Sequence, residues 1–151
     1  MTQTPTQTAS EQITEEVLSW TGTVAGHGSR GEFAFTIGRR EIGHLHGDRV
    51  LHAGFPKGVW QELFGAGRID YHPVFPGKPG YASRAIAGAE DVADVIALLR
   101  LNYDRAIATH GLPDAGCRLN TPALARCRRL EGYWSSASGR RSAPSRGATG
   151  A

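Results

Sequence analysis

Alternating hydrophobic and polar positions in the middle of the chain predict a small β-sheet. Large apolar residues occupy every second position of residues 33–37, as Phe33, Phe35 and Ile37, which is the period of a strand with one buried face. Further strands are expected at four places, residues 24–25, 40–46, 50–55 and 81–86. The links between the three central strands are short, so we expect these strands to pair as an antiparallel β-meander.

Apolar residues at helical spacing predict three helices before, within and after this group of strands. The first follows the capping-box spacing of Thr8 and Glu11, the second covers residues 56–65, and the third covers residues 90–110. The third carries the longest apolar stripe, formed by Val92, Val95, Ile96, Leu99, Tyr103, Ala106 and Ile107. This order predicts an α+β fold, whose mainly antiparallel sheet is packed by an N-terminal helix, a short middle helix and a long C-terminal core helix.

The loop between the strands at 40–46 and 50–55 decides which side chains share a face. A two-residue loop would pair His52 with Gly43 and place it opposite His44. A three-residue loop, residues 47–49, would pair His44 with His52 and put the three histidines of the hairpin on one face with Ile42. The second register leaves a cleanly apolar core face, which a one-residue slip would spoil. We therefore expect the three-residue loop.

The chain of 151 residues is long enough for one folded domain with a core. Its net charge of +3 is unevenly distributed: residues 1–116 hold 10 Lys and Arg against 13 Asp and Glu, whereas residues 117–151 hold 7 Arg against one Glu. We expect a disordered N-terminus at 1–9, an α+β domain at 10–116, and an Arg-rich extension at 117–151 with a short helix at 121–130 and disorder from about residue 135.

Composition limits the partners and the compartment that we expect. No run of 18 apolar residues and no signal-peptide pattern occurs, so we expect a soluble, cytoplasmic protein without a membrane partner. The Arg-rich extension could contact nucleic acid or anionic lipid, but solvated disorder is the simpler interpretation. Cys117 and Cys127 have a spacing that matches no metal-binding or redox pair, and we expect both to be reduced.

Histidines on the central strands are the strongest chemical signal. His44 and His46 alternate on one strand, which places their imidazoles on one side, about 6.5–7 Å apart along it. With His52 they could bind a transition metal through neutral nitrogen ligands. Without a metal, an imidazole is a natural general base near neutral pH, because its ordinary pKa is about 6.5. A purely structural interpretation, with histidines as half-exposed polar side chains, stays open.

Charged residues and a rigid loop flank these histidines. Strict alternation puts Arg40 on the face of His44, where its guanidinium could hold an oxyanion or carboxylate. Glu41 points to the other face unless a β-bulge at Gly43 or Gly38 re-aims it. The Pro- and Gly-rich residues 73–80 follow a further histidine, His72, and we expect them to close a pocket near the edge of the sheet.

These residues resemble a known family, the luciferase domain of fungal bioluminescence, over about residues 32–107. The resemblance rests on the run Arg40-Glu41-Ile42-Gly43-His44-Leu45-His46, the Leu51-His52 strand, a glycine five residues before His72-Pro73, and a closing helix ending near Asn102-Tyr103. One departure is Arg68, where the family pattern leads us to expect tryptophan. The resemblance implies a small oxygenase that uses O2 as co-substrate and no other cofactor, acting on an enolisable aromatic or pyrone-like small molecule similar to 3-hydroxyhispidin.

The resemblance also suggests roles for the residues that carry it. In the catalytic set, His44 or His46 would remove the enol proton, and Arg40 would stabilise the enolate and peroxide oxygens. Glu41 belongs to the same set, although an ion pair with Arg39 would explain it equally well. The expected substrate-binding residues are His52, His72, Tyr71 and Trp60, the last two as stacking walls. Two alternatives stay open: a metal-dependent enzyme that uses His44, His46 and His52, and a non-catalytic binding module with a basic tail.

Overall fold

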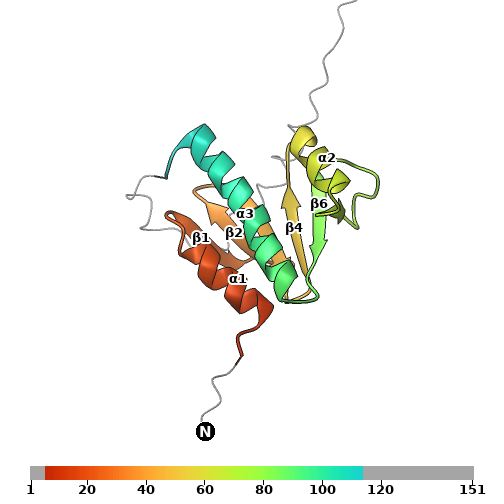
Figure 1. The fold of residues 1–151 in the computed structure, drawn as a ribbon. Coiled ribbons are helices and arrows are strands. Elements are labelled where there is room, and N and C mark those ends of the chain that lie inside the picture. Colours follow the sequence, from red (N-terminus) through yellow and green to blue (C-terminus); the bar gives the residue numbers. More distant parts are fainter. Residues whose placement is uncertain (1–5, 114–151) are drawn as a thin grey trace, which may run out of the picture.

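Six strands pair in one antiparallel sheet within residues 6–113, the part of the chain that the computed structural model describes (Figure 1). Their order across the sheet is β1-β2-β3-β4-β6-β5. The strands are β1 (Thr23–His27), β2 (Phe33–Ile37), β3 (Arg40–His46), β4 (Val50–Gly54), β5 (Asp70–Tyr71) and β6 (Tyr81–Ala85). The predicted meander is confirmed. The short strand β5, which the sequence pattern did not predict, pairs with β6 at the edge of the sheet.

The helices of the described region pack together with the sheet around one core. They are α1 (Ala9–Leu18), α2 (Lys57–Gly65) and α3 (Ala89–His110). Helices α1 and α3 contact each other and lie over the strands, and α3 also contacts β3 (Figure 1). Helix α2 adds Trp60 and Leu63 to the same core. The predicted α+β class, with its C-terminal core helix, is confirmed.

Burial explains why these segments adopt this arrangement. The fully buried side chains come from alternate strand positions and from one stripe of each long helix, and they are Phe35, Ile42, Leu45, Leu51, Ile13, Val17, Val95, Leu98 and Leu99. Burying a side chain of this size stabilises the folded state by roughly 1.5–3 kcal/mol relative to leaving it exposed. The predicted stripe of α3 needs one correction, because Leu98 is fully buried whereas Ile96, Ala106 and Ile107 are only partly buried.

A β-bulge interrupts the pairing of β2 with β3. Phe35 is opposite Gly43, but the next residue, Thr36, is opposite Glu41, so Ile42 is an extra residue in β3. Ile42 is 2% exposed and lies in the core. The expectation that Ile42 shares a face with the histidines is therefore wrong, because strict alternation fails at a bulge.

Two of the sequence predictions concern other parts of the chain. The capping box of α1 is confirmed, since the Thr8 side chain accepts the Glu11 N–H and the Glu11 carboxylate accepts the Thr8 N–H. The Arg-rich extension and the helix expected at 121–130 lie outside the described residues, as do residues 1–5. Within residues 6–113, no helix combines the length and apolar character that a membrane span needs.

Candidate functional site

Four imidazole rings lie together on one face of the sheet. Ring centroids are 5.1 Å apart for His44 and His46, 5.3 Å for His44 and His52, and 4.8 Å for His46 and His52. The His72 ring is 4.1 Å from that of His52. His52 is buried, at 8% exposed, whereas His46 is exposed at the end of β3. The four rings thus form a continuous cluster, which we call the histidine cluster.

The β3–β4 hairpin brings three members of the histidine cluster together. Its loop is residues 47–49, and His44 is opposite His52, which confirms the predicted register. Gly47 has a φ of +58°, a left-handed conformation that glycine adopts at little cost. Gly43, the residue before His44, points the other way, since a Cβ there would meet Leu99 of α3. The cluster therefore lies on the face opposite α3.

His72 reaches the cluster from the short edge strand β5. Asp70 is opposite Ser83 of β6, and Ser83 is in turn opposite His52 of β4. Residues that are directly opposite in a sheet share a face. Alternation from Asp70 then puts His72 on the face of His52, in agreement with the distance between their rings.

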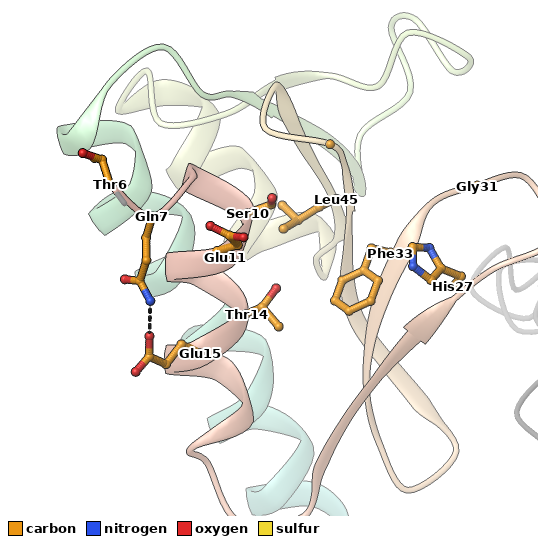
Figure 2. Close-up of a pocket in the computed structure, with 11 residues that line it drawn as sticks. Thr6, Gln7, Ser10, Glu11, Thr14, Glu15, His27, Gly31, Phe33 and Leu45 are labelled. Carbon is orange, nitrogen blue, oxygen red and sulfur yellow. Dashed lines mark hydrogen bonds between the residues drawn. The ribbon is translucent and has the colours of Figure 1, made fainter. Parts of the chain in front are cut away.

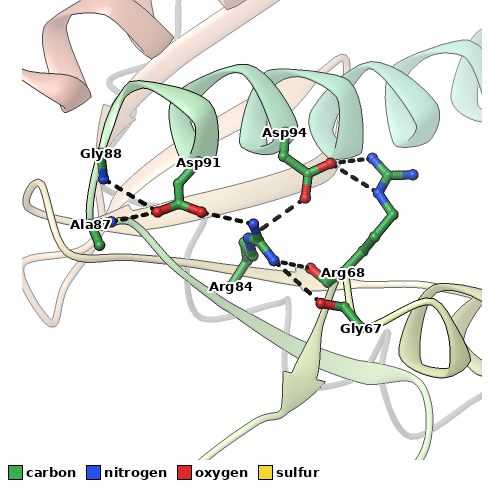
Figure 3. Close-up of polar contacts among 7 residues, drawn as sticks. All are labelled: Gly67, Arg68, Arg84, Ala87, Gly88, Asp91 and Asp94. Carbon is green, nitrogen blue, oxygen red and sulfur yellow. Dashed lines mark hydrogen bonds and ion pairs between the residues drawn. The ribbon is translucent and has the colours of Figure 1, made fainter.

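An ion-pair network on the helix side anchors the segment that leads to His72 (Figure 3). Arg84 of β6 donates to Asp91 of α3 at 2.8 Å and to the carbonyl oxygen of Arg68 at 3.2 Å. The Arg68 side chain binds Asp94, with Nε 2.9 Å from Oδ1. The turn before β5 is thereby tied to the first turns of α3. This network gives Arg68 a structural role at the position where tryptophan was expected.

The bulge places Glu41 beside His44. Glu41 is opposite Thr36 and His44 is opposite Ala34, two alternate residues of β2, so both point to the same face. The Glu41 Oε1 is 2.6 Å from the Nδ1 of His44. A carboxylate accepts but does not donate, so the Nδ1 of His44 carries a hydrogen; in the neutral form of the ring, the lone pair is then on Nε2. The sequence left open whether a β-bulge turns Glu41 toward the face of His44. The structure contains such a bulge, with Ile42 as the extra residue.

Arg40 lies on the face opposite the histidine cluster. It is paired with Ile37, a core residue 4% exposed, and residues paired in this way share a face. Its Nε is buried there without a hydrogen-bond partner among residues 6–113. The expectation that Arg40 shares a face with His44 is therefore wrong, because the extra residue at Ile42 reverses the alternation.

Burial keeps two of the histidines neutral. Burial, together with the neighbouring His72, His44 and His46, lowers the pKa of His52 to about 3. Burial also lowers the pKa of His72, with smaller contributions from His44 and His46. Loss of water disfavours the charged imidazolium, and so does positive charge nearby. Both rings are thus neutral near pH 7.

The tautomer of His72 is the reverse of that of His44. The backbone N–H of Val74 donates to the Nδ1 of His72 at 3.1 Å. Since a neutral imidazole has one protonated nitrogen, the Nε2 of His72 carries the hydrogen and is a donor. The histidine cluster therefore contains a ring with a free lone pair at Nε2 and another with an N–H at Nε2.

The two residues expected as stacking walls do not face the cluster. Tyr71 is opposite Ala82, a core residue, and its ring lies 4.9 Å from that of Trp60. Trp60 is only 2% exposed and donates its indole N–H to the carbonyl oxygen of Tyr81. The Trp60 ring therefore packs inside the core, and the Tyr71 ring packs against it on the same side of the sheet.

Aromatic rings that the sequence analysis did not select lie beside His72 instead. The ring of Phe75, 38% exposed, is 5.5 Å from that of His72 and 4.5 Å from that of Tyr81. Lys78 places its Nζ 5.6 Å from the Phe75 ring and 5.4 Å from the Tyr81 ring. Residues 73–80 therefore do lie beside the site, as expected. The missed signal was Phe75 itself, three residues after His72.

A recess of the described residues lies away from the histidine cluster (Figure 2). It is a groove of about 790 Å³ between the start of α1 and the strands, and its lining includes Ser10, Glu15, His27 and Phe33. No member of the histidine cluster lines it. We place the candidate site at the cluster, because the groove contains no comparable arrangement of interacting titratable groups.

The histidine cluster has the ligands for a transition metal. One nitrogen from each of His44, His46 and His52 can be chosen so that all three lie within 4.8 Å of one another. Bound imidazoles are neutral, which fits the lowered pKa of His52. His72 fits a ligand role less well, because its Nδ1 already accepts a hydrogen bond.

Comparison with known proteins gives one result. The family model described as Luciferase domain matches residues 39–102. No curated protein and no solved structure matches the chain. The matched segment begins at the start of β3, ends within α3 and contains the whole histidine cluster. The match confirms the resemblance to the luciferase domain family over residues 39–102.

Proposed function

We propose that the protein is an oxygenase that combines O2 with an enolisable aromatic or pyrone-like molecule at the histidine cluster. The observation that carries the proposal is the presence of opposite tautomers in one cluster. The Nε2 of His44, whose Nδ1 is held by Glu41, accepts a proton, and the Nε2 of the neutral His72, on the other side of His52, donates a hydrogen bond. Such a set suits a reaction that begins by removing an enol proton and holding the resulting enolate oxygen.

His44 is the base in this proposal. Its Nε2 takes the enol proton, and the Glu41 carboxylate, 2.6 Å from Nδ1, holds the ring in orientation and stabilises the imidazolium that forms. A positioned base of this kind typically contributes about 10²–10⁴ in rate. His46 is exposed and lies beside it, where it contacts the substrate but has no carboxylate partner among residues 6–113.

His72 takes over the stabilising role that the sequence had suggested for Arg40. Its Nε2–H donates to the enolate oxygen, and the neutral His52 ring, 4.1 Å away, excludes water behind it. The enolate then gives its electron pair to O2 with formation of a C–O bond. The peroxide anion that results takes back the proton from His44, so the charge and the proton are both accounted for.

Oxygen consumption and light emission with a panel of hydroxylated pyrones test this proposal. Glu41→Gln and His44→Ala should each lower the rate by about 10²-fold or more, whereas His110→Ala, at the exposed end of α3, should leave it unchanged. Turnover by His44→Ala at the wild-type rate would overturn the assignment of the base. Failure of the wild type on every pyrone would overturn the proposed reaction.

A second candidate, a metal-dependent enzyme, is favoured by the spacing of His44, His46 and His52. In that case the free Nε2 of His44 binds the ion, and Glu41 orients the ring as the carboxylate partner that metal-bound histidines usually have. Metal analysis and calorimetry with Zn²⁺ or Co²⁺, on protein without a histidine tag, separate the two. One ion per chain, lost in His52→Ala, would favour the metal enzyme.

A further inference from the structure

We infer that Asn102 of α3 is a positioning residue for the Glu41–His44 pair, acting through the bulge of β3 from the opposite side of the sheet. This inference depends on the proposed function only in taking that pair as part of the reaction centre. It holds whether His44 acts as a base or as a metal ligand, because both roles need the Glu41 hydrogen bond at Nδ1.

The side-chain amide of Asn102 joins the two strands that carry the site. Its Nδ2 donates to the carbonyl oxygen of Ile42 in β3 and to that of Gly54 in β4, both at 3.0 Å. Asn102 is 8% exposed. Both hydrogens of the amide are therefore used inside the protein, one on each strand.

The first of these carbonyl groups belongs to the bulged residue. Ile42 has no opposite residue in β2, because Phe35 is opposite Gly43 and Thr36 is opposite Glu41. A buried carbonyl oxygen without a donor is costly, and this position is the one where the ladder with β2 is disrupted. Asn102 supplies the missing donor and so stabilises the bulged form of β3.

The bulged form is the one in which Glu41 reaches His44. Without the extra residue, strict alternation would send Glu41 to the helix face, since side chains alternate with a period of two. Asn102 therefore favours the register that makes the 2.6 Å contact between Glu41 and His44. It touches neither residue, and its effect is transmitted through the backbone of residues 41–43.

Two side chains on one stripe of α3 fix the geometry of this contact. Leu99 lies one turn before Asn102 and packs on Gly43, where a Cβ would come within 2.7 Å of its Cδ2. The close approach of α3 to β3 lets the short Asn side chain reach the strand backbone. A glutamine or an aspartate would not replace it, because one is longer by a methylene group and the other has no donor when ionised.

Nitrogen NMR of the imidazoles tests the inference independently of activity. Asn102→Leu keeps a side chain of similar size but removes both donors, and we expect the His44 signals to lose the fixed Nδ1–H tautomer, as in Glu41→Leu, which has no acceptor for that hydrogen. The matched control is Tyr103→Phe, the next residue of α3, which removes a hydrogen bond from the Tyr103 hydroxyl to the Thr21 carbonyl oxygen at 2.8 Å. That variant should leave the His44 signals unchanged.

A folded Asn102→Leu variant with the wild-type His44 tautomer would overturn the inference. Should that variant fail to fold, Asn102→Ala, which is smaller and also removes both donors, gives the same comparison of His44 signals against Tyr103→Phe. In the oxygen assay, Asn102→Leu should lose as much rate as Glu41→Gln, and the double variant should lose no more than either single one. A tautomer change without any oxygenase activity in the wild type would support the positioning role and reject the proposed reaction.

Discussion

Gly43 precedes His44 of the site and lies against Leu99 of the core. Replacing Gly43 with alanine therefore tests how closely α3 packs on β3. A Cβ at this position would lie 2.7 Å from Cδ2 of Leu99 and 3.2 Å from the carbonyl oxygen of His52. Carbon atoms in good contact are about 3.5–4.0 Å apart. Leu99 is fully buried and the His52 carbonyl is backbone, so neither has free space to withdraw.

The expected cost of Gly43→Ala follows from this overlap. Inserting a methyl group into a packed core typically costs about 1–3 kcal/mol. For a domain of this size, each kcal/mol lowers the melting temperature by about 4–8 °C. We therefore expect Gly43→Ala to lower the melting temperature by at least about 4 °C and to displace His44 and His52 from their present contact.

Thermal and urea unfolding measure this cost. Gly58→Ala is the matched control, because Gly58 is in α2 with no atom within 4 Å of an added Cβ, and alanine there should be neutral or stabilising by up to about 1 kcal/mol. Leu99→Ala should cost less in the Gly43→Ala background than in the wild type, since it removes the clashing atom. A Gly43→Ala variant within about 0.5 kcal/mol of the wild type would refute the close packing of α3 on β3.

Three further predictions concern pH and the ion-pair network. The pKa of His52 is about 3 in the folded protein and near 6.5 in the unfolded chain, so the free energy of unfolding is highest above pH 6.5 and decreases as the pH falls from 6.5 toward 3. His52→Gln removes this titration, and the midpoint of urea unfolding should then change less over that pH range. Asp48 accepts the Ser10 N–H at the start of α1, which lowers its pKa, so Asp48→Asn should lower the melting temperature at pH 7, and this difference should shrink as the pH falls below 3.8, the ordinary value. Arg84→Leu should speed amide hydrogen exchange in residues 67–72 while leaving β2 unchanged.

Local signals were sufficient to predict the hairpin that carries most of the site. The choice between a two-residue and a three-residue loop followed from the apolar positions Leu45 and Leu51, which had to share the core face. That choice places His44 opposite His52, as in the structure. The same kind of pattern could not place Tyr71, because β5 has two residues and too few alternating positions to show which side is buried.

The roles of Arg40 and Glu41 could not be predicted in this way, because the feature that decides them is distant in sequence. Strict alternation assigns Arg40 to the face of the histidines. With Ile42 as an extra residue in β3, Glu41 lies on that face and Arg40 lies on the opposite one. The donor that satisfies the Ile42 carbonyl is Asn102, 60 residues further along the chain. A pattern within β3 contains no trace of that bond. The bulge changes the chemistry of the site as well, because it places the Glu41 carboxylate, and not the Arg40 guanidinium, against His44. A developing negative charge in such a site must be stabilised by N–H donors such as His72 or by a bound cation.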